Sequence, residues 1–315
     1  MTGLSGMPRG RVRLVSAAGA VVMTVAGVGA GEAVAAGRVA SSPAAAPVHG
    51  PVAAADGTSV ARAGSLAAPV NPLRAVDRVG DLYRYRLSGG GLNPRERDGV
   101  GWDVVRLATQ ADHDADGSPD GVWTLNGTGN VYYAPITRVG EQTPGSMRVG
   151  SGWGIYDMFV SPGNLGGAAA DDLITRDGAG VLWMYLGYGD GRVTARVKIG
   201  GGWQVYDQIT GKGDLTGDGR ADIVARDSNG VLYLYKGTGN YKAPFAPRTR
   251  IGAGWNQFNN LVSIGDIDFD GRTDLLARST GGALFLYKGT GSATTPFKPK
   301  TIVGTGGWNT YRIMF

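Results

Sequence analysis

Three short runs of the sequence place carboxylates at alternate positions around a glycine. The fullest is GDIDFDGRTD at 265–274, which has Asp at loop positions 1, 3, 5 and 9 and Gly at position 6. Oxygen ligands at this spacing suit a hard cation such as Ca²⁺, because alternate side chains point inward and the glycine lets the backbone fold over the ion. The predicted ligands are Asp266, Asp268, Asp270, Asp274 and the backbone carbonyl of Arg272.

Two further runs repeat this spacing. ADHDADGSPD at 111–120 predicts side-chain ligands and one carbonyl ligand, namely Asp112, Asp114, Asp116, Asp120 and the carbonyl of Ser118. GDLTGDGRAD at 213–222 predicts a second such set, in which a threonine replaces one carboxylate: Asp214, Thr216, Asp218, Asp222 and the carbonyl of Arg220. His113 falls at the second, outward-facing position of its loop and is expected to be exposed and not a ligand.

A fourth run, GNLGGAAADD at 163–172, keeps Asn164 and Asp172 but has Gly166 and Ala168 where ligands should stand. We expect it to hold no ion. All these runs have a simpler interpretation as turns rich in Asp and Gly, which are common turn formers. Three copies in register favour metal loops over turns alone. An EF-hand is the other alternative, but it needs a loop of about 12 residues that ends in Glu between helices.

The loops belong to a repeat that is marked by a Gly-Trp pair. Its tryptophans are Trp102, Trp153, Trp203, Trp255 and Trp308, at spacings of 51, 50, 52 and 53 residues. Each Trp opens an alternating segment that leads to the loop, a short apolar strand (DIVAR), a turn (DSNG), an aromatic strand (VLYLY) and a last strand (RTRIG). Both faces of VLYLY are largely apolar, so its sheet needs neighbours on both sides. Four-stranded units around a common axis supply them.

The two ends of the repeat complete each other. Residues 73–87 match the second and third strands of a unit, and the chain ends after WNTYRIMF, which matches only the first. A shared unit of this kind closes the ring and leaves no free sheet edge. The sequence therefore predicts an all-β fold over 72–315, a β-propeller of about five four-stranded blades whose ring is closed by the N- and C-terminal strands. One blade more or fewer is the alternative.

The N-terminal part has a different composition. Residues 1–35 carry three arginines, an apolar run and small residues that suit cleavage, which predicts a signal peptide, with an uncleaved membrane anchor as the alternative. Residues 36–71 are rich in Ala, Pro and Gly and predict a disordered linker. We therefore expect a secreted, extracellular protein without a membrane span after cleavage. The chain has no cysteine, so bound metal is a candidate source of stability.

The segment GDLTGDGRADIVARDSNGVLYLYKGTG at 213–239 resembles the FG-GAP/VCBS repeats of integrin α-chain propellers and of secreted bacterial proteins. This resemblance extends over roughly 72–315. It implies a propeller that holds calcium in loops between the first two strands of a blade. Integrin propellers have seven blades, and this chain is too short for seven. The repeat family does not fix a function.

Composition weakens the case for an enzyme. Glu occurs only as Glu32, Glu96 and Glu141, and the chain has no Cys and two His. A propeller glycosidase would need carboxylates in its central cavity. Asp103, Asp157 and Asp207 recur near the Trp segments, but Asn260 and Arg312 break the pattern. The formal charge of +5 falls to +3 without residues 1–35 and shows no basic block, so nucleic acid is not a predicted partner.

We therefore predict a non-catalytic binding module that recognises an extracellular glycan or, alternatively, a protein through adhesion. Aromatic side chains stack on sugars and also dominate protein interfaces. The five repeat-defining tryptophans are candidate ligand-binding residues; the alternative is that they pack between blades, and their solvent exposure separates the two roles. The sequence makes no prediction of oligomeric state.

Overall fold

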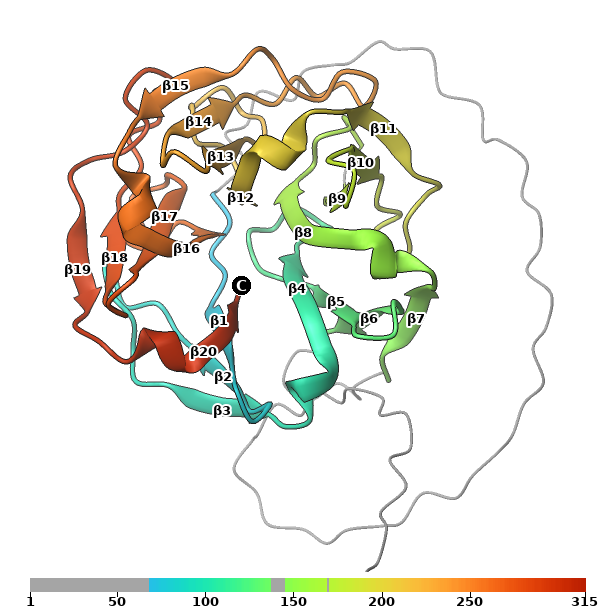
Figure 1. The fold of residues 1–315 in the computed structure, drawn as a ribbon, viewed down its shortest axis with the longest axis horizontal. Coiled ribbons are helices and arrows are strands. Elements are labelled where there is room, and N and C mark those ends of the chain that lie inside the picture. Colours follow the sequence, from blue (N-terminus) through green and yellow to red (C-terminus); the bar gives the residue numbers. More distant parts are fainter. Residues whose placement is uncertain (1–67, 137–144, 169) are drawn as a thin grey trace, which may run out of the picture.

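The computed structural model describes residues 68–136, 145–168 and 170–315, which form five antiparallel sheets arranged as a ring (Figure 1). Each sheet has four strands, so the prediction of a propeller with about five blades is confirmed. The predicted signal peptide at 1–35 and most of the predicted linker lie outside the described residues. No helix in the described ranges has the length and apolar character that crossing a membrane would need.

The blades are numbered here along the ring, and each runs from an inner to an outer strand. Blade 1 contains β20 (Tyr311–Met314), β1 (Leu73–Asp77), β2 (Leu82–Tyr85) and β3 (Glu96–Gly99). Blade 2 contains β4 (Val105–Ala111), β5 (Gly121–Asn126), β6 (Val131–Pro135) and β7 (Met147–Gly150). Blade 3 contains β8 (Tyr156–Gly163), β9 (Asp172–Asp177), β10 (Leu182–Tyr185) and β11 (Val197–Gly200). Blade 4 contains β12 (Tyr206–Thr210), β13 (Ile223–Asp227), β14 (Leu232–Tyr235) and β15 (Thr249–Gly252). Blade 5 contains β16 (Phe258–Gly265), β17 (Asp274–Ser279), β18 (Leu284–Tyr287) and β19 (Thr301–Gly304).

The two chain ends meet in blade 1, as the sequence predicted. The C-terminal strand β20 pairs with β1 in antiparallel register, with Ala75 opposite Met314 and Val76 opposite Ile313. The backbone of Arg74 also exchanges two hydrogen bonds with Phe315, at 2.8 and 2.9 Å. Closing the sheet in this way pairs the backbone groups that an open edge strand would leave exposed.

A three-residue 3₁₀ turn precedes each inner strand and explains the repeated Gly-Trp pair. These turns are η1 (Trp102–Val104), η2 (Trp153–Ile155), η3 (Trp203–Val205), η4 (Trp255–Gln257) and η5 (Trp308–Thr310). The glycine before each turn has a left-handed backbone, with φ between 78° and 88°. Glycine adopts this region without steric cost, so the chain can turn sharply and direct the indole into the contact between blades.

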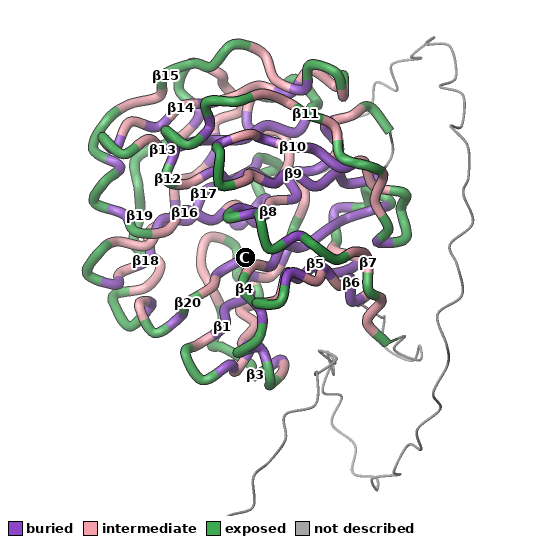
Figure 2. The backbone as a smooth tube through the Cα atoms, turned by 45° about the vertical axis from the view of Figure 1, so that its right-hand side comes forward, coloured by how far each residue is buried: buried purple, intermediate pink, exposed green. Residues whose placement is uncertain are grey.

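The core consists of the apolar faces of neighbouring blades. One cluster joins Leu232 and Leu234 of blade 4 to Phe258 and Leu261 of blade 5. Figure 2 shows the buried residues concentrated in the strands and the exposed ones in the turns that connect them. The prediction that both faces of a blade are covered by neighbours is therefore confirmed.

Residues 68–71 belong to the propeller, although the sequence analysis assigned them to the linker. Asn71 is buried, and its amide donates to the carbonyl of Ile264 at 3.1 Å. The amide of Val70 donates to Gly117 O at 2.6 Å, and Pro69 O accepts from Asp266 N at 2.7 Å. These contacts are made by backbone groups, which the Ala- and Pro-rich composition of the segment does not reveal.

Candidate metal loops and outer clusters

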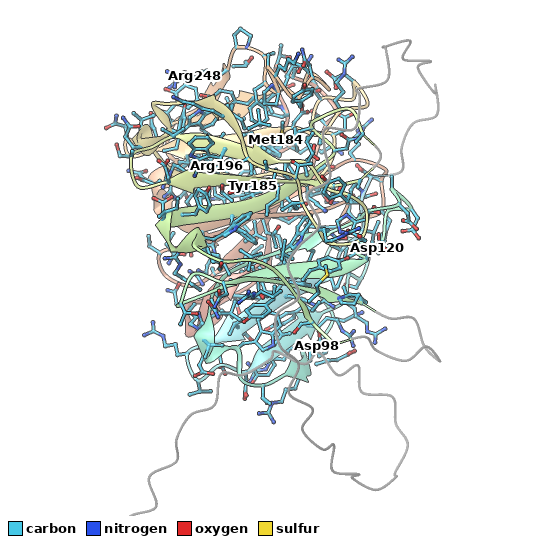
Figure 3. All side chains as sticks on the ribbon, turned by 90° about the vertical axis from the view of Figure 1, so that its right-hand side faces the viewer. Asp98, Asp120, Met184, Tyr185, Arg196 and Arg248 are labelled. Atoms are coloured by element: carbon cyan, nitrogen blue, oxygen red, sulfur yellow. The ribbon has the colours of Figure 1, made fainter. Side chains whose placement is uncertain are left out.

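The four loops that the sequence singled out all connect an inner strand to the second strand of its blade. They are the 112–120 loop of blade 2, the 164–172 loop of blade 3, the 214–222 loop of blade 4 and the 266–274 loop of blade 5. Because the inner strands all run in the same direction along the ring axis, the four loops lie at the same end of the propeller. Asp120 lies at this end in Figure 3. This is the location that the resemblance implied.

Two of the loops bring carboxylates together in the described chain. One oxygen from each of Asp266, Asp268 and Asp274 lies within 4.8 Å of the others, and Asp112, Asp114 and Asp116 meet the same limit. Asp112 Oδ1 is buried without a hydrogen-bond partner in the described structure. An all-oxygen donor set with an unsatisfied buried carboxylate oxygen fits a hard cation.

The other predicted side-chain ligands make different contacts. Asp214 Oδ2 accepts from Gly219 N at 2.6 Å, and Asp218 forms an ion pair with Lys236 at 3.1 Å. Asp270 lies 3.4 Å from Lys298 Nζ. Asp120 accepts the amide of His113 at 2.6 Å. In the described residues the 214–222 loop therefore has no cluster as compact as the other two, and Asp270 and Asp120 lie outside the two compact groups.

The aspartate at position 9 has a structural role that the sequence analysis missed. Asp172, Asp222 and Asp274 are fully buried. In the 164–172 loop, Asp172 Oδ1 accepts from Gly187 N at 3.1 Å and Oδ2 from Gly166 N at 2.7 Å. Asp274 likewise accepts from Gly289 N at 2.7 Å and Ile267 N at 2.9 Å.

These bonds tie each loop to the segment after the third strand of its blade. Burial raises the pKa of the three carboxyls to about 6. The signal was available in the sequence, because Asp172 persists in a loop that has lost other ligand positions.

The 164–172 loop has a buried ion pair beside it. Lys212 of blade 4 pairs with Asp171, and both side chains are buried. Asp171 Oδ2 also accepts from Ser161 Oγ at 3.1 Å and from Asp112 N at 2.9 Å. The carboxylate therefore links blades 2, 3 and 4, and it is held by charge-assisted hydrogen bonds, which are the stronger kind.

His113 is not exposed, contrary to the prediction. Only 6% of it is accessible, because its ring packs edge-on against Trp123, with ring centres 5.1 Å apart, and near Tyr133. Burial lowers the pKa of the imidazole. The second position of this loop points toward the blade contact and not toward solvent, which the spacing of the ligands could not show.

The five repeat tryptophans are buried, with exposures of 0–8%. Trp153 stacks on Tyr185 with ring centres 4.1 Å apart, and Trp102 stacks on Phe315. A sugar platform needs an accessible ring face, so the assignment of these residues to ligand binding is corrected in favour of packing between blades.

Five arginines clamp each blade to the next through the carbonyls of the 3₁₀ turns. Arg278 Nη1 donates to Trp308 O at 3.0 Å and Tyr311 O at 2.7 Å. Arg176 makes the equivalent bonds to blade 4 and Arg226 to blade 5. In blades 1 and 2 the clamp comes from the inner strand, as Arg312 and Arg106. The sequence repeat does not reveal the clamps, because their arginines come from two different strands.

The clamps explain the recurring aspartates near the Trp segments. Asp157 pairs with Arg176 at 2.9 Å and Asp207 with Arg226 at 3.7 Å. Asn259 takes the same role toward Arg278, at 2.7 Å. Arg312 therefore does not mark a variable edge. It stands at the inner-strand position of Asp157 and Asp207, in a blade whose second strand has no arginine at the clamp position.

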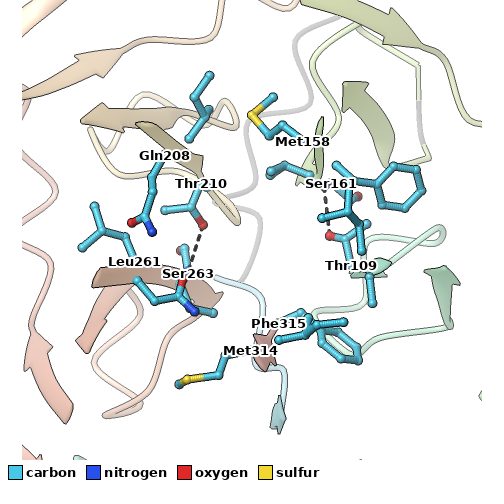
Figure 4. A pocket seen from close by; sticks show the side chains of 18 of the residues that line it. Thr109, Met158, Ser161, Gln208, Thr210, Leu261, Ser263, Met314 and Phe315 are labelled. Carbon is cyan, nitrogen blue, oxygen red and sulfur yellow. Dashed lines mark hydrogen bonds between the residues drawn. The ribbon is translucent and has the colours of Figure 1, made fainter. Parts of the chain in front are cut away.

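A central cavity of about 270 Å³ runs between the inner strands. Figure 4 shows hydroxyl and apolar side chains around it, with hydrogen bonds from Ser161 to Thr109 and from Ser263 to Thr210. Asp157 and Asp207 are the carboxylates in its lining. Both take part in the arginine pairs, so their charge is already balanced.

Three blades carry an outer cluster of two tyrosines and an arginine. In blade 3, Tyr156 and Tyr185 share a hydrogen bond of 2.7 Å, and Arg196 donates to Tyr156 Oη at 3.0 Å. The corresponding residues are Tyr311, Tyr85 and Arg95 in blade 1, and Tyr206, Tyr235 and Arg248 in blade 4. Burial raises the pKa of Tyr85, Tyr185 and Tyr235. These hydroxyls remain protonated, and each takes part in the hydrogen bond to its partner tyrosine.

Each arginine of an outer cluster also covers a partly exposed aromatic ring. The guanidinium carbon of Arg196 lies 4.1 Å from the ring centre of Trp183. The distances are 4.4 Å for Arg95 over Tyr83 and 4.3 Å for Arg248 over Tyr233. An ammonium takes this place in blade 5, where Lys300 lies 4.6 Å from Phe285. One arrangement of ring and cation therefore recurs on four blades.

Comparison with known proteins supports the repeat. Residues 214–277 match the FG-GAP-like repeat family model, and no curated protein matches the chain. Solved propellers are similar at low identity. BP39L lectin from Burkholderia pseudomallei is 11% identical, with 73% of this chain and 69% of that chain covered and a TM-score of 0.47.

AofleA from Arthrobotrys oligospora is 12% identical, with 75% and 69% covered and a TM-score of 0.46. Prp20p from Saccharomyces cerevisiae is 11% identical, with 74% and 61% covered and a TM-score of 0.37. Similarity at this level carries no information about ligands. Residues 214–277 therefore form an FG-GAP-like repeat within a five-bladed β-propeller.

Proposed function

We propose that this chain is a non-catalytic propeller that binds carbohydrate outside the cell and uses calcium to stabilise its loops. The observation that carries the proposal is the recurrence of a partly exposed aromatic ring beside a cation on four blades. Aromatic rings supply apolar contact with few rotatable bonds. The adjacent cations supply directed hydrogen bonds. Weak single sites repeated around a ring gain strength by avidity.

The central cavity gives less support to catalysis. A glycosidase needs carboxylates that are free to act as acid, base or nucleophile. Asp157 and Asp207, which line the cavity, are occupied by Arg176 and Arg226. In this position the two carboxylates orient the arginines that clamp one blade to the next.

Calcium fits the 112–120 and 266–274 loops best. Asp112, Asp114 and Asp116 would hold it in the first loop, with the carbonyl of Ser118. Asp266, Asp268 and Asp274 would hold it in the second, with the carbonyl of Arg272. The 214–222 loop is a third and weaker candidate, because Thr216 brings no charge. The ion would neutralise carboxylates that otherwise repel one another at close range.

A glycan-binding experiment on the full chain in millimolar calcium tests the ligand class. The triple variant Tyr83→Ala, Trp183→Ala, Tyr233→Ala removes three of the partly exposed rings. We expect binding to at least one class of glycan, and a loss of about tenfold or more in this variant, since avidity multiplies the single-site losses. Val79→Ala is the control, because this side chain is 77% exposed and lies in the turn between β1 and β2, outside the clusters. A chain that binds no glycan contradicts the proposal.

A second candidate, protein recognition, rests on a different surface. Val104, Ile155 and Val205 end the 3₁₀ turns of three consecutive blades and are 44%, 54% and 47% exposed. Equivalent apolar side chains at one end of a ring form a contact surface for another protein. If the triple change to Ser at these positions abolishes adhesion to cells while glycan binding is unchanged, recognition uses this end instead.

A further inference from the structure

The outer clusters carry more positive charge than a neutral sugar would need. In blades 1, 3 and 4 the outer strand places a second basic residue two positions after the cluster arginine: Arg97, Lys198 and Arg250. These residues stand directly opposite Tyr83, Trp183 and Tyr233 on the neighbouring strand. Residues two apart on a strand share a face, so each aromatic ring lies between two exposed cations.

The cluster arginines are held in place before any ligand arrives. Arg95 and Arg196 each use Nη1 for the tyrosine hydrogen bond and stack on a ring. In the described part of the chain, their Nε and Nη2 groups make no hydrogen bond. A guanidinium fixed in this way pays little conformational entropy when it binds a carboxylate or sulfate through its remaining donors.

Nearby acidic groups cancel only part of this charge. Asp81 pairs with Arg97 at 2.7 Å. Asp177 accepts two turn amides at 3.0 Å and the indole of Trp183 at 2.8 Å. Asp227 accepts the turn amides of Asn229 and Val231. Asp177 and Asp227 hold their own turns through these bonds. In the described part of blade 1, Arg95 is the cluster cation that forms no ion pair with a carboxylate.

Blades 2 and 5 carry only part of this cluster. Blade 2 has Val105, Ala134 and Ser146 in the positions of the two tyrosines and the arginine. Blade 5 has Phe258 and Lys300, with Ile302 in place of the second cation. The full set of two tyrosines, a ring and two cations is therefore present in three blades, whereas blade 2 keeps only the ring of Tyr132 and the cation opposite it, Arg148.

We propose that the outer clusters of blades 1, 3 and 4 bind an acidic polysaccharide, whose carboxylate or sulfate groups pair with the cations while its sugar rings contact the aromatic side chains. This inference rests on the proposed carbohydrate binding and names its ligand class. A polymer with repeated charges reaches several clusters at once and gains avidity. The clusters are discrete and lie one to a blade, unlike the continuous basic stripe that favours nucleic acid. Figure 3 shows Arg196 and Arg248 on successive blades at the same side of the ring.

The test uses the full chain with immobilised carboxymethyl dextran and dextran sulfate, and neutral dextran as the matched uncharged polymer. We expect both acidic polymers to bind, and their affinity to fall as salt rises, because exposed charges are screened. The variant Arg95→Gln, Arg196→Gln, Arg248→Gln should lose at least about tenfold in affinity, as three linked contacts are weakened together. The control Arg78→Gln, Arg192→Gln, Lys242→Gln removes the same charge from exposed positions of the same blades and should change affinity less than about twofold.

Melting temperatures of both variants separate a binding role from a structural one. If the cluster variant unfolds at a lower temperature but binds like the wild type when folded, the arginines only stabilise the blades and the proposal is wrong. An equal loss in the control variant, or equal affinity for a DNA duplex, would show a general preference for polyanions and also overturn it. Binding of neutral dextran or another neutral glycan alone would leave the proposed function intact and refute this inference.

Discussion

The 266–274 loop and the 164–172 loop occupy the same place on two blades but balance their buried carboxylates differently. In the first, Asp266, Asp268 and Asp274 converge within 4.8 Å, and Asp268 also pairs with the partly exposed Lys288 at 2.8 Å. In the second, ligand positions are filled by Gly166 and Ala168, and the neighbouring Asp171 is paired with Lys212. Both loops keep the buried aspartate at position 9 and its bonds to backbone amides. The shape of the loop therefore follows from that aspartate, and the additional carboxylates of the 266–274 loop make it the candidate for an ion.

The largest effect should come from removing the internal cation of blade 4. Lys212→Met leaves Asp171 buried without its charge partner, which should cost about 3–5 kcal/mol of unfolding free energy. Urea denaturation measures this loss, and added calcium should not restore it. Lys242→Met, at an exposed position, is the control and should change stability by less than about 0.5 kcal/mol. If Lys212→Met is as stable as the wild type, the ion pair does not contribute to the stability of the fold.

The position-9 aspartates should matter equally in both loops. Asp172→Ala and Asp274→Ala each leave buried backbone amides without a hydrogen-bond acceptor. We expect each change to lower the free energy of unfolding by about 3 kcal/mol. For Asp172→Ala the cost should be the same in calcium and in chelator. A variant of Asp172 that loses stability only in calcium would mean that the 164–172 loop also binds the ion.

Removing calcium should affect the loops to different degrees, according to the ligands that each loop offers. Chelator should lower the melting temperature of the wild type, since an ion at several times its dissociation constant contributes roughly 1 kcal/mol per site. Asp268→Ala should reduce this response in the 266–274 loop, whereas Asn164→Ala should leave it unchanged. Calorimetry should show tighter binding in the 266–274 loop than in the 214–222 loop, where Thr216 replaces a charge. If chelator does not shift the melting temperature, the loops are turns only.

The smallest effect is the pH dependence of the calcium response. Burial raises the pKa of Asp274 and Asp172 to about 6, above the unfolded value of about 3.9. In chelator these carboxyls therefore favour the folded state increasingly as pH falls through 6. In calcium, protons compete with the ion for Asp274, so the stability gained from calcium should shrink over the same range. A gain that is constant between pH 7.5 and 5.5 contradicts this prediction.

The repeat positions predicted much of the fold because they are local. The Gly-Trp pair, the alternating VLYLY strand and the complementary chain ends were enough for the number of blades and for the closure by β20 and β1. The loops were placed correctly between the first two strands. The calcium ligands remain predictions, and the two compact carboxylate groups include Asp268 and Asp116 but not Asp270 or Asp120.

What the sequence by itself determined is therefore the strand period, the blade repeat and the spacing of oxygen ligands, since each depends on residues close together in the chain. Burial and partnership were decided by the tertiary structure. The indole of Trp153 and the ammonium of Lys212 are enclosed by neighbouring blades, and the imidazole of His113 is covered by Trp123 and Tyr133 of its own blade. No local sequence pattern shows which side chains will cover a given residue. The arginine clamps show the same limit, because an equivalent contact can be supplied from either of two strands once the ring has brought them together.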